Sequence, residues 1–184
     1  MSTKYKFTDK EATYFVTSTV VGWIDVFTRE IYKAVLLDSF RFCQKNQGLQ
    51  IYAWVLMTNH FHMICSVINN NDPGMVIKNI KSFTATKLID AIIKNNQESR
   101  KSWMLNLFEQ YGAQEKSNGR YQFWTHDNHP VLLDDAAMLQ QRMDYVHENP
   151  VRAGYVSAPE HWMYSSAIDY YVENGKGLLK LVKV

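Results

Sequence analysis

Cysteine, glycine and proline are scarce in this chain of 184 residues, and no long hydrophobic run occurs. The cysteines are Cys43 and Cys65, one in a predicted helix and one in a predicted strand, which fits free thiols in a reducing compartment better than a disulfide framework. Eight Gly and four Pro exclude collagen-like and linker-like sequences. The apolar runs fall far short of the ~20 residues of a membrane helix, and the first residues lack the apolar segment of a signal peptide. We therefore expect a cytoplasmic protein without a membrane segment.

The charges are nearly balanced, because 20 Lys and Arg stand against 18 Asp and Glu. A formal net charge of +2 neither requires nor excludes nucleic acid as a partner. Residues 78–101 are locally basic, with six Lys or Arg against two Asp or Glu, in a segment predicted to be helical. This excess fits a solvated helix face as well as a surface that contacts phosphates.

The length is sufficient for one domain with a sizeable core, and no internal repeat divides the chain. We expect one domain over residues 1–184, with its core at about 13–171. Residues 95–118 are mostly polar and are expected to be variable, irregular and mobile. Residues 172–184 are expected to form a tail.

The secondary structure is predicted to alternate between strands and helices. Runs rich in β-branched and aromatic residues predict strands at 13–21, 49–57, 60–68 and 121–126. In the second strand, alternation predicts Ile51, Ala53, Val55 and Met57 on one face and Tyr52, Trp54 and Leu56 on the other.

Apolar residues at helical spacing predict helices at 28–46, 73–94 and 135–148. Thr28 is the expected N-cap of the first helix, and Pro150 is expected to end the last one. The resulting order β-α-β-β-α-β-α indicates an α+β, ferredoxin-like (RRM-like) sandwich with a central antiparallel sheet and an additional C-terminal helix.

His60 and His62 lie two residues apart in the predicted strand 60–68. Side chains at this spacing point to the same face of a strand, so two imidazoles lie side by side, as in many metal sites. Phe61 and Met63 point to the opposite, apolar face. Alone, an HxH pair is as typical of two histidines that are hydrogen-bonded on a partly exposed strand as it is of a metal site.

The helix at 135–148 carries Tyr145, with Asn149 one turn further on, so both lie on one side. Leu139, Met143 and Val146 follow helical spacing and are expected to face the core. A tyrosine beside a metal could act as a nucleophile on phosphate. Alone, this pattern more often describes a tyrosine at the edge of a core and an asparagine at a helix end.

Residues 53–62 read AWVLMTNHFH, residues 145–154 read YVHENPVRAG, and residues 162–167 read WMYSSA, followed by Tyr170 and Tyr171. In this order, these motifs resemble the HUH single-strand tyrosine transposases, in particular the REP-associated tyrosine transposases. The similarity spans roughly 13–171, and nothing in it can be aligned over 95–118.

The resemblance implies a single-strand DNA endonuclease and strand transferase with Tyr145 as the nucleophile. It implies that His60 and His62 hold a divalent metal, Mg²⁺ or Mn²⁺, and that Asn149 takes the place of the third ligand. The expected intermediate is a 5′-phosphotyrosine, formed together with a free 3′-OH. The 3′-OH of a second strand could reverse this cleavage step without ATP.

The implied partner is single-stranded or hairpin DNA, bound by a monomer or a homodimer. The basic residues that could neutralise its phosphates are Lys78, Lys81, Lys87 and Arg152. Aromatic residues at 121–126 could also stack on unpaired bases, although such residues commonly belong to a core.

Three other functions stay open. A domesticated relative would bind hairpin DNA without moving it, with or without metal. A metal-dependent phosphodiesterase for small substrates would remain active without Tyr145. A zinc hydrolase would need a further His, Asp or Glu, for which His126, His129 and His147 are available, although each is more typical of a structural or exposed histidine.

Overall fold

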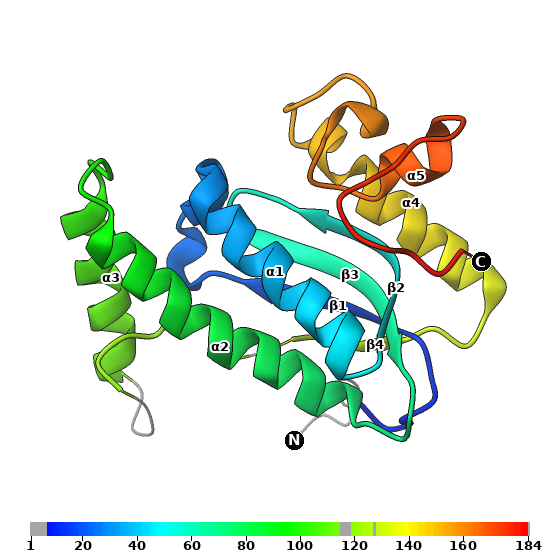
Figure 1. The fold of residues 1–184 in the computed structure, drawn as a ribbon, viewed down its shortest axis with the longest axis horizontal. Helices are drawn as coiled ribbons and strands as arrows, with labels where there is room; N and C mark the ends of the chain where they lie inside the picture. Colours follow the sequence, from blue (N-terminus) through cyan, green and yellow to red (C-terminus); the bar gives the residue numbers. More distant parts are fainter. Residues whose placement is uncertain (1–6, 115–118, 127, 184) are drawn as a thin grey trace.

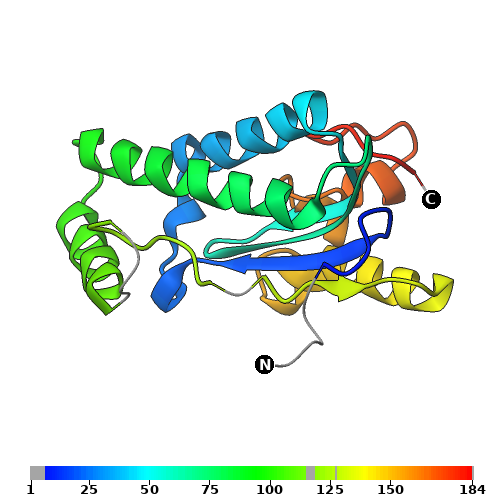
Figure 2. The same cartoon turned by 90° about the horizontal axis from the view of Figure 1, so that it is seen from below.

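The computed structural model describes residues 7–114, 119–126 and 128–183 of the chain. Helices α1 (Glu30–Asn46) and α2 (Pro73–Lys94) cover one face of a sheet, and helix α4 (Ala136–Arg152) lies on the other face (Figure 1, Figure 2). The predicted α+β class, with helices packed on a central antiparallel sheet, is confirmed. The other helical segments are α3 (Lys101–Gln114), α5 (Ala167–Tyr171) and the 3-10 turns η2 (Val21–Trp23), η3 (Val26–Thr28) and η4 (Pro159–His161). None of the helices in the described ranges has the length and apolarity to cross a membrane.

The sheet has four antiparallel strands in the order β2-β3-β1-β4. They are β1 (Tyr14–Thr19), β2 (Leu49–Leu56), β3 (His60–Val67) and β4 (Val131–Leu132). As predicted, β2 and β3 form a tightly connected pair, in which Met57 N donates to His60 O. β3 is therefore an interior strand, covered on both edges, and its histidines belong to a rigid part of the fold.

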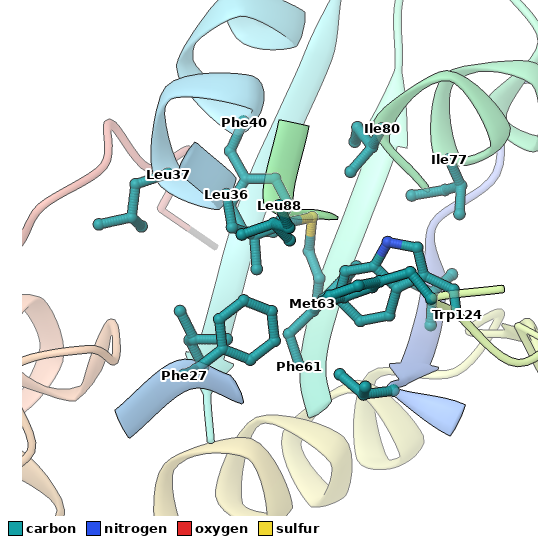
Figure 3. Packing of buried hydrophobic residues seen from close by; sticks show 14 of the residues in the cluster. Phe27, Leu36, Leu37, Phe40, Phe61, Met63, Ile77, Ile80, Leu88 and Trp124 are labelled. Atoms are coloured by element: carbon teal, nitrogen blue, oxygen red, sulfur yellow. The ribbon is translucent and has the colours of Figure 1, made fainter. Parts of the chain in front are cut away.

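Most of the core fills the space between the sheet and helices α1 and α2. Phe61 and Met63 alternate with the histidines along β3 and point toward these helices (Figure 3). Phe61 meets Phe40 of α1 edge to face, with ring centroids 5.2 Å apart. Burial of each such side chain contributes ~1.5–3 kcal/mol. This large core stabilises the sheet from one side, whereas the two histidines of β3 lie on the other face.

A smaller apolar cluster lies between the other face of the sheet and α4. It includes Phe15 of β1 and Ile64 of β3, packed against Met143 and Val146 of α4. Residues three apart share one side of a helix, so Met143 and Val146 determine which side of α4 meets the sheet. Tyr145 lies at the margin of this cluster.

A β-bulge at Tyr52 changes the predicted alternation in β2. The register shifts between Ile51 and Ala53, so one extra residue stands opposite β3. Ile51 consequently belongs to the core under α1 and α2, whereas Tyr52 and Ala53 lie on the α4 side. The predicted faces are therefore wrong for Ile51 and Tyr52, because a bulge reverses the alternation on one side of itself.

Helix α3 occupies much of the region that the sequence predicts to be irregular. Met104 and Phe108, four residues apart, are buried on its inner side. Gly112 permits a close backbone approach, because a Cβ there would lie 2.7 Å from the carbonyl oxygen of Arg120. The expectation of irregular structure is thus wrong at 101–114, and the last part of the segment, 115–118, lies outside the described residues.

The fourth strand is not where the sequence predicts it. Residues 121–126, all of which the structure describes, contain an isolated bridge at Trp124 but no strand, and β4 lies further along the chain. Phe123 and Trp124 are buried, with their rings 4.9 Å apart. They are core residues, which rules them out as stacking faces for bases.

Two predicted helix ends also differ. α1 begins at Glu30 after Arg29, because the Thr28 hydroxyl bonds to Asp25 O and Arg100 instead of capping the helix. α4 continues through Pro150 to Arg152. The helix ends two residues after Pro150, where Gly154, with φ of 76°, lets Tyr155 N donate back to Pro150 O and so caps the helix end.

The C-terminal segment covers the outer edge of β2. Ser165 pairs with Val55, and Val182 N donates to Ile51 O. Such coverage satisfies edge groups that could otherwise pair with another chain. Residues 178–182 therefore pack along β2 and α1 instead of forming a free tail.

Candidate active site

β3 and α4 bring His60, His62 and Tyr145 together. The two imidazoles lie on one face of β3 with ring centroids 4.8 Å apart, and the Tyr145 ring lies 5.2 Å from His62. Phe15 of β1 stacks on His62 at 5.3 Å and supports its orientation. Asn149, one turn beyond Tyr145, interacts with the His60 side chain. The four residues named as catalytic or metal-binding thus lie at one site.

His62 is buried, and its two ring nitrogens have different environments. Nδ1 lies 2.8 Å from Oγ1 of Thr17. Nε2 is buried and has no hydrogen-bond partner in the part of the chain that the structure describes. Burial, followed by the nearby His60 and Arg142, lowers the pKa of His62 to about 3. The ring is therefore neutral near pH 7, which is the form that binds metals.

His60 is oriented by the amide of Asn59. Nδ2 of Asn59 donates to Asp25 Oδ1 at 2.9 Å and to Trp23 O at 3.3 Å. Oδ1 of Asn59 consequently faces Nδ1 of His60, at 2.7 Å. Because an amide oxygen can only accept, Nδ1 carries the hydrogen and Nε2 keeps its lone pair. Burial lowers the pKa of His60, an effect that Asn149 and Asp25 partly offset.

This donor set fits a divalent metal ion. His60 has a lone pair on Nε2, the buried Nε2 of His62 lacks a partner, and Asn149 can add an amide oxygen beside His60. Thr17 and Asn59 would then act as the groups that orient the ligands. The donors are neutral, so they would leave the charge of the metal available for a phosphate.

The other histidines do not complete a zinc site. His147 is buried, and its Nε2 lies 2.8 Å from the hydroxyl of Ser166, so it has a structural partner. His126 and His129 are exposed. Among the described residues there is no group of three or more His, Cys, Asp or Glu side chains that could hold a metal ion. The zinc hydrolase alternative therefore lacks its third ligand there.

Two arginines add positive charge around the site. The guanidinium of Arg152 lies 5.7 Å from the centre of the Tyr145 ring, and Arg152 is exposed. Arg142 lies over Phe15 at 5.1 Å, and its Nε is buried without a partner among the described residues. This charge would favour an anionic group, such as a phosphate, next to Tyr145.

Of the basic residues named for DNA contact, Arg152 is the one at this site. Lys78, Lys81 and Lys87 belong to α2, on the opposite side of the sheet. Nζ of Lys81 donates to Thr125 O at 2.7 Å and to Asn128 Oδ1 at 2.6 Å, so it fastens the segment after α3. Nζ of Lys87 lies 5.7 Å from the centre of the Phe83 ring, and Lys78 is exposed.

Sequence reasoning did not identify Thr17, Asp25 or Trp23 as parts of this site. Each comes from an element distant in sequence from the histidines and from Tyr145, so its role becomes visible only in the folded chain. Asn59, by contrast, directly precedes His60, and an amide next to a metal-binding histidine is a signal that could have been followed.

The family model identifies the class of this protein as a transposase. The family model described as "Transposase IS200 like" matches residues 14–149, and the chain belongs to this family. No curated protein sequence shows significant similarity to it.

Solved structures resemble the fold as well. A REP-associated tyrosine transposase bound to a REP hairpin superposes with a TM-score of 0.67 at 16% identity, covering 100% of this chain and 93% of the other. A candidate transposase from Deinococcus radiodurans R1 gives a TM-score of 0.46 at 16% identity, covering 79% of this chain and 98% of that one.

Proposed function

We propose that this chain is a metal-dependent single-strand DNA endonuclease and strand transferase that forms a covalent bond between Tyr145 and DNA. The observation that carries the proposal is the approach of the Tyr145 ring to His62, 5.2 Å between centroids, beside a buried imidazole nitrogen without a partner among the described residues. The hairpin in the similar REP-associated transposase supports hairpin-containing DNA as the substrate.

In the cleavage step, the phenol oxygen of Tyr145 attacks the scissile phosphorus. The bond from phosphorus to the 3′ oxygen breaks, which leaves a 5′-phosphotyrosine on one side and a 3′-OH on the other. The phenol proton leaves to solvent, and the departing 3′ oxygen takes up a proton, so the charges balance. A divalent metal, Mg²⁺ or Mn²⁺, held by His60, His62 and Asn149, would supply Lewis-acid polarisation of the phosphate.

Joining reverses this chemistry with a different strand. The phosphotyrosine retains the energy of the phosphodiester, so an incoming 3′-OH can displace Tyr145 without ATP. Arg152, exposed beside the Tyr145 ring, is placed to contact a phosphate of the bound strand. Lys78 and Lys87 would contact a more distant part of the DNA, because they lie on the other helical layer.

A single chain contains every residue of the proposed centre. Tyr145 and both histidines approach one another without a second subunit. A monomer would therefore suffice, and a homodimer would be compatible with the same geometry.

The decisive experiment traps the covalent intermediate. The protein is incubated with a labelled single-stranded hairpin and Mn²⁺, denatured, and separated by gel electrophoresis. We expect a labelled protein–DNA adduct that Tyr145→Phe and EDTA abolish. Tyr155→Phe is the matched control, because Tyr155 is an exposed tyrosine whose hydroxyl lies 3.4 Å from Thr58, close to the same histidines.

The other outcomes separate the alternatives. Hairpin binding without an adduct in any variant would identify a domesticated DNA-binding protein. Cleavage that is unchanged in Tyr145→Phe would identify a phosphodiesterase. An adduct that persists in Tyr145→Phe and disappears in Tyr155→Phe would keep the reaction and reassign the nucleophile.

A further inference from the structure

Trp23 is an exposed tryptophan in a segment whose other apolar side chains are buried. Trp23 is 65% exposed, whereas the nearest apolar residues before and after it, Val21 and Ile24, are 3% and 2% exposed. Val26 and Phe27, which follow, are fully buried. A large aromatic side chain is thus held in water by a segment that is itself anchored in the core.

The backbone fixes this position. Gly22 and Trp23 both adopt positive φ, 61° and 55°, a conformation that is rare for a bulky residue and costs about 1 kcal/mol or more. Any other residue at position 22 would be strained, because a Cβ there would lie 3.0 Å from the Tyr111 ring of α3. Trp23 O accepts from the Asn59 side chain, which ties the turn to the β2–β3 connection. Strain of this kind persists when the surroundings determine the conformation, and it is common at functional sites.

Trp23 stands directly beside the candidate metal ligands. Its ring centroid lies 5.8 Å from that of His60, with an angle of 71° between the planes. The rings of Trp23, His60, His62 and Tyr145 form a continuous series, in which His60 is 4.8 Å from His62 and His62 is 5.2 Å from Tyr145. A DNA strand with its phosphate at the histidines would bring a neighbouring base to Trp23.

Other exposed aromatic side chains are less suitable. Tyr155 is 50% exposed, but one face of its ring stacks on Trp162 at 5.4 Å and 25°. Phe42 and Phe83 belong to α1 and α2, on the opposite side of the sheet from the histidines. Trp23 combines exposure, rigidity and proximity to His60.

We propose that Trp23 is a stacking platform for an unpaired nucleobase next to the scissile phosphate. This inference rests on the proposed function and adds a positioning residue to it. Base stacking tolerates any sequence, because every base has a π-face, and it selects unpaired over duplex DNA, in which the base faces are already stacked. Trp23 would therefore favour single-stranded DNA at the cleavage point without specifying its sequence.

The test compares Trp23→Phe with Trp23→Leu, in a Tyr145→Phe background so that no cleavage occurs. Fluorescein-labelled (dT)₁₂ and a fluorescein-labelled duplex are titrated with each variant in Mn²⁺, and Kd is measured by anisotropy. Trp103→Leu is the matched control, because Trp103 of α3 is 53% exposed and lies outside the site. Thermal unfolding followed by circular dichroism checks that each variant is folded.

We expect Trp23→Leu to weaken binding of (dT)₁₂ about tenfold, as stacking on one base predicts, and Trp23→Phe to stay within about threefold of the parent. Duplex binding and Trp103→Leu should be unchanged. Equal affinities of the Leu and Phe variants for (dT)₁₂, or no binding of (dT)₁₂ by the parent, would overturn the stacking role.

Failure of this inference and failure of the proposed function give different results. If the chain with Tyr145 intact forms no adduct while Trp23→Leu weakens (dT)₁₂ binding, the stacking role is supported and the proposed covalent chemistry is refuted. If the adduct forms and Trp23→Leu leaves both binding and adduct yield unchanged, the covalent chemistry is supported and the stacking role is refuted.

Discussion

Replacing Glu98 by Gln should destabilise the protein at neutral pH and have much less effect in acid. The Glu98 side chain is fully buried between two arginines. Its Oε2 accepts from Arg29 Nε at 2.7 Å, and its Oε1 accepts from Arg100 Nε at 3.0 Å and from the Arg100 backbone N at 3.1 Å. Glutamine keeps the shape but loses the charge and one acceptor.

The magnitude follows from the displaced pKa. The hydrogen bonds of Arg100, which outweigh burial, and those of Arg29 lower the pKa of Glu98 from 4.5 to about 2. Such a displacement corresponds to ~3 kcal/mol at full strength. The side chains of Arg29 and Arg100 keep 40% and 31% of their surface in water, so solvent screening reduces this effect. We expect Glu98→Gln to lower the free energy of unfolding by about 2 kcal/mol at pH 7.

The sign of the pH dependence is specific. A carboxyl whose pKa is lowered by folding contributes its stabilisation above the unfolded-state pKa and loses it as the pH falls toward the folded-state value. The difference between the parent protein and Glu98→Gln should therefore be constant above pH 5.5, about one unit above 4.5, and shrink as the pH falls toward 2.

Urea unfolding followed by circular dichroism at pH 7 and pH 3 measures this difference. Glu109→Gln is the control, because its ion pair with Arg120 is solvent-exposed and should contribute nothing measurable. A Glu98→Gln protein as stable as the parent at pH 7, or a deficit of the same size at pH 3, would refute the reasoning.

Three further results are expected. The double variant His60→Ala, His62→Ala should abolish the covalent adduct. Its affinity for the hairpin should stay within about threefold of the parent, since neither imidazole supplies a charge for phosphate contact. If gel shifts and adduct assays show that hairpin binding and adduct formation are lost equally, the histidines are structural. Asn59→Ala should lower the adduct rate about tenfold by freeing the His60 ring, as loss of a ligand-orienting group does; an unchanged single-turnover rate would contradict that role. Gly22→Ala should lower thermal stability by about 1–2 kcal/mol, because it combines positive φ with a contact to Tyr111; an unchanged melting midpoint would show that the turn relaxes.

A helix or strand is predicted accurately where the spacing of its apolar residues matches the residues that it buries. β2, β3 and α2 lie at or within one residue of their predicted bounds, because their apolar spacing matches the two faces of the sheet. β4 has two residues, too few to show an alternation of apolar and polar side chains. It forms a strand because it pairs with the edge of β1. α3 has few buried residues, among them Met104 and Phe108, in a polar stretch, so its amphipathic pattern is weak.

The same distinction applies to the site. The spacing of His60 and His62 predicts their common face, since strand geometry alone determines it. Trp23 and Asp25 have no comparable signal, because their partners at 59 and 60 are far away in the sequence. Local geometry can be inferred from spacing, whereas the groups that orient a ligand depend on which loops the fold brings together.

A single loop links the stability of the fold to the geometry of the site. Arg100, held by Glu98, donates to Asp25 O at 2.8 Å, and Asp25 Oδ1 accepts from Asn59, which orients His60. The connection between α2 and α3 thereby supports the imidazole at the start of β3. Because every link is a hydrogen bond to a group with a fixed direction, a change at Glu98 can alter the angle at which His60 presents Nε2 without touching the ring. The apolar core on the α1 and α2 side stabilises the sheet, and this polar chain determines how the sheet presents its histidines.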